Sequence, residues 1–133
     1  MNGIFSPRHG GLICLCLFGA ATLLGCSNRI NNAPVNADKA RDVLKIALES
    51  WKKGDKSDAL QGAAPPIYII DVEWQGGAKL VDYEIVNNGR EMDAHLFCPV
   101  KLTVRDSTGQ ESKKEVTYII STAPNVTVSR KVF

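Results

Sequence analysis

The segment that decides the fold is residues 36–54, NADKARDVLKIALESWKKG. Its apolar side chains recur at steps of three and four residues, a spacing that places them on one face of an α-helix. Asn36 is a favourable N-terminal cap, because its side chain can accept a hydrogen bond from the first turn, and Gly54 is a favourable stop. The sequence therefore predicts one amphipathic helix between these two residues, with an apolar face made of Ala40, Val43, Leu44, Ala47, Leu48 and Trp51.

Beyond this helix, apolar residues alternate with polar ones, a period typical of β-strands. The first alternating run, residues 67–75, is predicted to be a strand with Tyr68, Ile70, Val72 and Trp74 on one face. The pair Gly76 and Gly77 follows it and predicts a tight hairpin into a second strand. The second strand is predicted over residues 79–87, and three more strands are predicted over residues 93–106, 111–122 and 126–132.

We therefore expect an α+β fold, in which the N-terminal helix packs on a curved antiparallel sheet of four to five strands. Pro99 lies inside the long strand over residues 93–106, and it cannot donate a backbone hydrogen bond, so an edge or a bulge is predicted there. The predicted domain spans residues 37–133, a length that allows one small domain. The inward residues of the long strand are predicted to be Leu96, Cys98, Val100, Leu102 and Val104.

The N-terminal residues have the order of a bacterial export signal. Arg8 precedes an uncharged run over residues 10–25, which is too short for a bilayer-spanning helix. The string Leu23-Leu24-Gly25-Cys26 resembles the lipobox of bacterial lipoproteins, and this resemblance implies that Cys26 is linked to diacylglycerol and becomes the first mature residue. An ordinary secretory signal with a chance cysteine, or an uncleaved anchor, are the alternatives.

These assignments divide the chain into a signal peptide over residues 1–25, a flexible tether over residues 26–36 and the domain. The tether prediction rests on its polar, asparagine-rich composition. The expected location is the bacterial cell envelope, with a membrane lipid bound through Cys26, and Ser27 favours the outer membrane over the inner one by resemblance to other lipoproteins. Cys98 is the one cysteine left over in the domain, and we expect it to be a buried small residue without a disulfide partner.

Charge excludes one class of partner. The whole chain has 16 Lys and Arg against 14 Asp and Glu, and removal of residues 1–25 leaves 15 basic and 14 acidic side chains. A nearly neutral domain argues against an electrostatic nucleic-acid binder, because such proteins need a basic surface.

The string ALESWKKGD, residues 47–55, resembles the first helix of cystatin-like and nuclear-transport-factor-2-like domains. Residues 70–85 are similar to a run found in small bacterial lipoproteins of unassigned function. This resemblance implies a cone-shaped sheet wrapped on the helix, often with a pocket between them, and often a homodimer. The His/Asp pair used by the enzyme branches of that superfamily has no clear counterpart in this sequence.

No catalytic or metal motif stands out. His95 and Cys98 are three residues apart in a strand, which points them to opposite faces, so no metal site and no cofactor are expected. The strongest cluster is acidic: Asp71, Glu73, Asp82 and Glu84 come together if the two strands joined at Gly76 pair. With Tyr83 and His95 nearby, this predicts a candidate acid–base pocket, whereas a solvated sheet face is the favoured interpretation.

Trp51 and Trp74 allow two interpretations: they could stack and line a ligand pocket, or close the mouth of a small core, which is favoured. We therefore expect an envelope lipoprotein whose domain is a non-catalytic binding or structural module, with an unknown envelope protein or small ligand as its partner. The alternative is a small-ligand pocket protein or a weak enzyme of the polyketide-cyclase-like type that uses Asp71, Asp82 or His95.

Overall fold

Helix α1 (Ala37–Lys53) forms as its sequence predicts, in a computed structural model that describes Gly3 and residues 33–133. The Asn36 side chain accepts a hydrogen bond from the backbone N–H of Lys39 at 3.0 Å. Gly54 ends the helix in a left-handed conformation with φ of +92°, which favours glycine. All six residues of the predicted apolar face are buried. The predicted signal peptide, apart from Gly3, and Cys26 lie outside the described residues.

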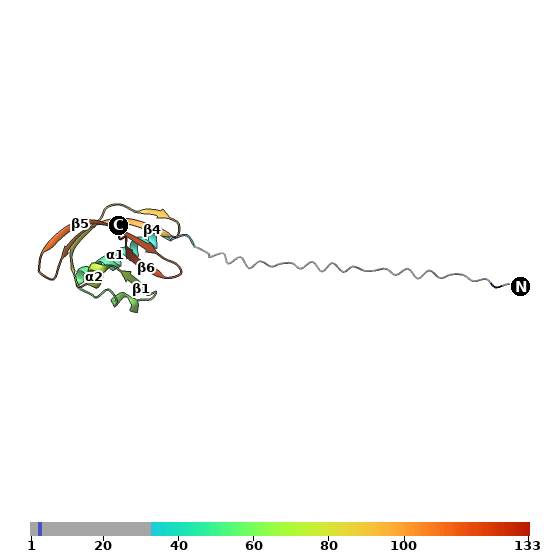
Figure 1. Cartoon of the computed structure of the whole chain (residues 1–133), viewed down its shortest axis with the longest axis horizontal. Helices are drawn as coiled ribbons and strands as arrows, with labels where there is room; N and C mark the ends of the chain where they lie inside the picture. Colours follow the sequence, from blue (N-terminus) through green and yellow to red (C-terminus); the bar gives the residue numbers. More distant parts are fainter. Residues whose placement is uncertain (1–2, 4–32) are drawn as a thin grey trace.

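The strands form one curled, six-stranded sheet that wraps around α1 (Figure 1). The strand order is β1-β6-β5-β4-β2, and the short β3 pairs with β4. A 3₁₀ turn, η1 (Ala59–Gly62), lies between α1 and the first strand. The strands are β1 (Ile67–Ile70), β2 (Lys79–Ile85), β3 (Arg90–Met92), β4 (His95–Arg105), β5 (Glu111–Ser121) and β6 (Val126–Arg130).

The core fills the space between α1 and the concave face of this sheet. The predicted inward residues of β4 are all buried, and Tyr118 and Ile120 of β5 are buried beside them. The α+β prediction is therefore confirmed at the level of one main helix on a curled sheet. No helix among the described residues is both long enough and apolar enough to cross a bilayer.

The prediction of one strand over residues 67–75 is wrong. Strand β1 ends at Ile70, and a short helix, α2 (Val72–Gln75), follows. The side chain of Asp71 causes the change, because its Oδ1 accepts hydrogen bonds from the backbone of Glu73 at 3.0 Å and of Trp74 at 3.3 Å. The predicted facing is also reversed in β1, where Ile67 and Ile69 are buried while Tyr68 and Ile70 are exposed.

Gly76 and Gly77 do not form a hairpin between paired strands. They end α2, and the strands on either side of them, β1 and β2, lie at opposite ends of the strand order. Strand β1 instead pairs with β6 in parallel, so the sheet is mixed and the prediction of an antiparallel sheet is wrong at this edge. Helix α2 changes the direction of the chain between β1 and β2, so these two strands are consecutive in sequence but do not pair in the sheet.

Strand β4 is not at the edge of the sheet, so an edge position for Pro99 is wrong, but the pairing on one side of β4 is interrupted at this residue. On one side it lies opposite Thr117 of β5. On the other side the partner of β4 changes, from β3 up to Phe97 to β2 from Val100 onward. The missing N–H of the proline therefore falls where one partner strand ends and the next begins.

Candidate functional site

A buried ionic cluster occupies the concave face of the sheet beside the C-terminal end of α1. The Tyr118 hydroxyl donates to Asp71 Oδ2 at 2.6 Å, and Arg130 Nη2 lies 2.9 Å from the same oxygen. Arg130 Nη1 lies 2.8 Å from Glu73 Oε2, and Lys114 forms an ion pair with Glu73 Oε1. We call these five residues the Asp71–Arg130 network.

Strand parity explains why these side chains meet. Asp71 comes two residues after Ile69 and four after Ile67, so its side chain points to the same buried side of the sheet as theirs. Arg130 continues the inward phase of Val126 and Val128 in β6, and it lies opposite Tyr118 of β5. Three segments distant in sequence thus bring their inward polar groups to one place.

Aromatic rings enclose the guanidinium group of this network. Arg130 Cζ lies 6.0 Å from the centre of the Trp51 ring and 5.9 Å from that of Tyr118, within range of a cation–π contact. The Arg130 side chain is only 9% exposed and that of Asp71 is fully buried. The Asp71–Arg130 pair is therefore shielded from solvent, whereas Glu73 and Lys114 at the other side of the network are partly exposed.

Electrostatics fix the charges of this network at neutral pH. Burial and the neighbouring Asp71 raise the pKa of the Tyr118 hydroxyl well above its usual range. Burial alone would lower the pKa of Arg130, but its hydrogen bond to Tyr118 and its ion pairs with Glu73 and Asp71 raise it above the ordinary value. Tyr118 thus stays a neutral phenol and Arg130 stays a cation, so neither group exchanges a proton in the physiological range.

Glu73 is expected to make the stability of the domain depend on pH. Burial raises the pKa of Glu73, but Lys114 and Arg130 lower it by more, so the folded-state pKa lies below the ordinary value of 4.5. The ionised Glu73 therefore stabilises the folded domain fully at pH values above 4.5, and this stabilisation is lost as the pH falls through the folded-state pKa. Urea unfolding should show Glu73→Gln to be less stable than the parent at neutral pH, with the difference shrinking in acid. A difference that stays constant with pH would contradict this assignment.

Trp51 and Trp74 form a stacked pair, with ring centres 5.3 Å apart and planes 8° from parallel. Each indole N–H donates at 2.8 Å to a backbone carbonyl, Trp51 to Ala78 and Trp74 to Asp55. The residues are only 2% and 6% exposed, as the core-closing interpretation predicts. Both tryptophans also line a depression of about 460 Å³, together with residues of the turns that follow α1 and α2.

The predicted acidic cluster does not exist. Asp71 and Glu73 belong to the buried network, whereas Asp82 and Glu84 lie on β2, which is separated from β1 by the rest of the sheet. The cause is the α2 turn, which prevents the expected pairing of the two strands. Asp82 is exposed and lies 3.4 Å from Lys52 of α1.

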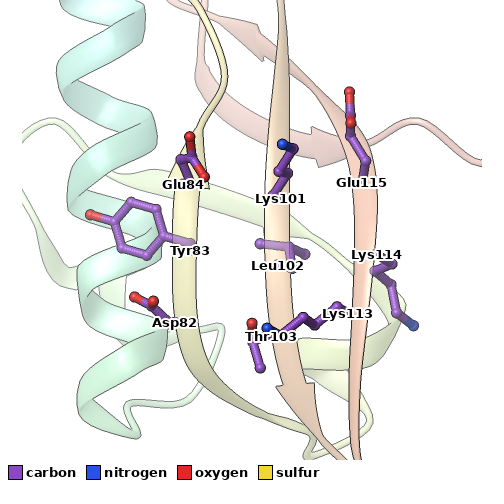
Figure 2. A pocket seen from close by; sticks show the side chains of 9 residues that line it. All are labelled: Asp82, Tyr83, Glu84, Lys101, Leu102, Thr103, Lys113, Lys114 and Glu115. Atoms are coloured by element: carbon purple, nitrogen blue, oxygen red, sulfur yellow. The ribbon is translucent and has the colours of Figure 1, made fainter.

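A second depression, of about 390 Å³, lies over β2, β4 and β5 (Figure 2). Figure 2 shows Glu84, Lys101 and Glu115 side by side across the three strands, in agreement with their register. Opposite charges in neighbouring positions are typical of a solvated sheet face. Tyr83 points toward α1, where its hydroxyl donates to Glu49 at 2.6 Å, and burial and this bond raise its pKa to about 12.

His95 and Cys98 lie on opposite faces of β4, as their spacing predicts. His95 is exposed at the start of the strand, whereas Cys98 is buried and forms no disulfide. Burial raises the pKa of the Cys98 thiol, which makes it less reactive. Within residues 33–133, no group of three or more His, Cys, Asp and Glu side chains is placed to hold a metal ion.

Sequence reasoning named Asp71 but missed Tyr118 and Arg130 as its partners. The sequence does contain a signal for Arg130. It alternates with Val126 and Val128, so its side chain points to the same buried side of β6 as theirs. A charged group in such a position needs a buried partner. Comparisons with protein-family models, with curated proteins and with solved structures found no match.

Proposed function

We propose that the protein is a bacterial lipoprotein anchored in the cell envelope through Cys26, and that its α+β domain is a non-catalytic binding or structural module. The anchor is supported by the string Leu23-Leu24-Gly25-Cys26, which follows an uncharged apolar run. Two acyl chains on one cysteine hold a protein far more firmly than the marginal binding of a single chain. Ser27 supports the outer membrane as the location.

The filled concave face of the sheet is the observation that carries the non-catalytic part of this proposal. Asp71 and the stacked tryptophans occupy the place where a cone-shaped domain would keep a pocket. The residues that a polyketide-cyclase-like enzyme would use are scattered, since Asp71 is buried, Asp82 lies on β2 and His95 starts β4. The depression over β2, β4 and β5 is lined by Asp82 but by neither Asp71 nor His95, which supports recognition through the outer surface.

Membership of the cystatin-like and nuclear-transport-factor-2-like superfamily is part of the same proposal. It is supported by one long helix held in the concavity of a curled sheet. An envelope protein, a small ligand or a second copy of the chain would bind to the exposed surface of this sheet.

Substitution Cys26→Ser tests the anchor. We expect the variant to remain unprocessed or to be lost from the detergent phase in phase partitioning, because it lacks the thiol that accepts diacylglycerol. Ser27→Ala is the matched control, since it changes the neighbouring residue and leaves the thiol in place. Mass spectrometry of the N-terminal peptide from the native host should find an acylated Cys26, and an unmodified Cys26 would disprove the anchor.

A further inference from the structure

A groove on the outer face of the sheet lies between β3, β4 and the segment after β6. It has a volume of about 690 Å³. Met92, Phe97 and Pro99 give it an apolar floor, with Arg90 and Lys131 beside them and Asn88 at the rim. We call it the β3 groove.

The lining of the β3 groove is cationic and apolar. It contains two basic side chains and no carboxylate, and neither Arg90 nor Lys131 forms an ion pair with another described residue. Glu91, the nearest acid on β3, points to the opposite face from Arg90, because adjacent side chains in a strand alternate. A ligand that matches this groove would therefore carry both negative charge and apolar groups.

The rim of the groove is held close to β4. Gly89 has a φ of +78°, and a Cβ atom there would lie 2.8 Å from the carbonyl oxygen of Phe97. Only glycine fits this approach. The groove is therefore bounded by a turn packed directly on the strand.

The groove also lies at the end of the domain where the tether enters. Arg41, in the first turns of α1, donates from Nε to the carbonyl oxygen of Asn88 at 2.8 Å. The backbone N–H of Asn36 donates to Thr122 Oγ1 at 3.1 Å, just after the end of β5, which pairs with the start of β4. Asn36 follows Cys26 by ten residues, so a chain of this length spans at most about 35 Å. A lipid on Cys26 would thus keep this end of the domain within about 35 Å of the bilayer.

We propose that the β3 groove docks on the anionic headgroups of the bilayer that holds Cys26. Arg90 and Lys131 bind the phosphates, and Met92 and Phe97 contact the boundary between headgroups and acyl chains. Two basic side chains near an anionic surface shift the equilibrium toward the docked state roughly 30-fold. This inference rests on the proposed lipid anchor and adds the orientation of the domain on the membrane.

The test uses the lipidated protein reconstituted into vesicles of phosphatidylcholine, with or without phosphatidylglycerol. A polarity-sensitive fluorophore is attached through Asn88→Cys, and the buried Cys98 leaves the new thiol as the accessible one in the domain. We expect a blue shift in emission on the phosphatidylglycerol vesicles that high salt reverses, because salt screens exposed charges. The same fluorophore at Ser107→Cys, in the turn at the opposite end of β4, should not respond.

Charge reversal identifies the residues responsible. The double variant Arg90→Glu and Lys131→Glu should abolish the blue shift. Lys101→Glu with Lys113→Glu makes the same change in net charge over the other depression of this face and should leave the shift intact. Each variant is first checked for an unchanged unfolding midpoint, so that loss of the shift reports docking and not misfolding.

The outcomes separate this inference from the anchor. No blue shift on a protein whose Cys26 is acylated would overturn docking and leave the anchor standing. An equal shift on neutral vesicles, or a shift that requires added envelope proteins, would overturn the anionic bilayer as the occupant. An unmodified Cys26 would disprove the anchor and the orientation that depends on it.

Discussion

Replacing Arg130 with methionine is expected to lower the free energy of unfolding by about 3–5 kcal/mol, because it leaves the buried carboxylate of Asp71 without its cation. Asp71 is fully buried, and Arg130 lies 2.9 Å from one of its oxygens. The loss reflects an unpaired buried charge more than the strength of the pair itself. Arg130 Nε is buried and has no hydrogen-bond partner in the described part of the chain, so the pairing is incompletely satisfied. Urea unfolding followed by circular dichroism measures the effect.

Arg105→Met is the matched control for this experiment. Arg105 pairs with Glu111 at 2.6 Å, but both side chains are 46% exposed, and exposed pairs of this kind contribute about 0–1 kcal/mol. If Arg130→Met does not fold, adding Asp71→Asn should restore folding in part, since it removes a charge that the first change left unpaired. Equal effects of the two arginine substitutions would contradict the buried network.

Replacing Trp51 with alanine is expected to lower the free energy of unfolding by about 3–5 kcal/mol, the usual cost of truncating a buried aromatic ring. The ring is 2% exposed and stacks on Trp74. Truncation opens a cavity, uncovers Trp74 and leaves the carbonyl of Ala78 without its 2.8 Å hydrogen bond. Thermal unfolding measures the stability, and the emission of Trp74 should shift to the red in the variant.

Ile46→Ala is the control on the same helix. Ile46 is 49% exposed and lies away from the sheet, so its truncation should change the stability by less than about 0.5 kcal/mol. A near-neutral Trp51→Ala would mean that the indole pair does not close the core. The pair would then have to be reconsidered as part of a ligand site.

The helix and the long strands were predictable because their information is local. Asn36, the apolar face and Gly54 define α1 within one stretch of chain, and the structure places its ends at those residues. Every second residue of β4 from Leu96 to Val104 is apolar, and so is every second residue of β5 from Val116 to Ile120, so this spacing gives their inward faces.

The segment over residues 67–77 was mispredicted because its signals are ambiguous. Residues 67–70 read IYII, which offers apolar side chains to both faces and so does not fix a parity. The alternating pattern places Asp71 on the polar face of a strand, whereas its side chain caps α2. Its partners Tyr118 and Arg130 lie far along the chain, and only the register of β5 with β6 brings them together. The candidate site could therefore be predicted only in part.

The parallel pairing of β1 with β6 also restricts the order in which the chain can assemble. The nearest sheet partner of β1 comes almost at the end of the described sequence, so bringing the two together closes a long loop at a large entropic cost. Asp71 meets its counter-ion only after that closure, because Arg130 is the final residue of β6. We therefore expect β1 and Asp71 to form their native contacts late in folding, after β2, β4 and β5 have paired.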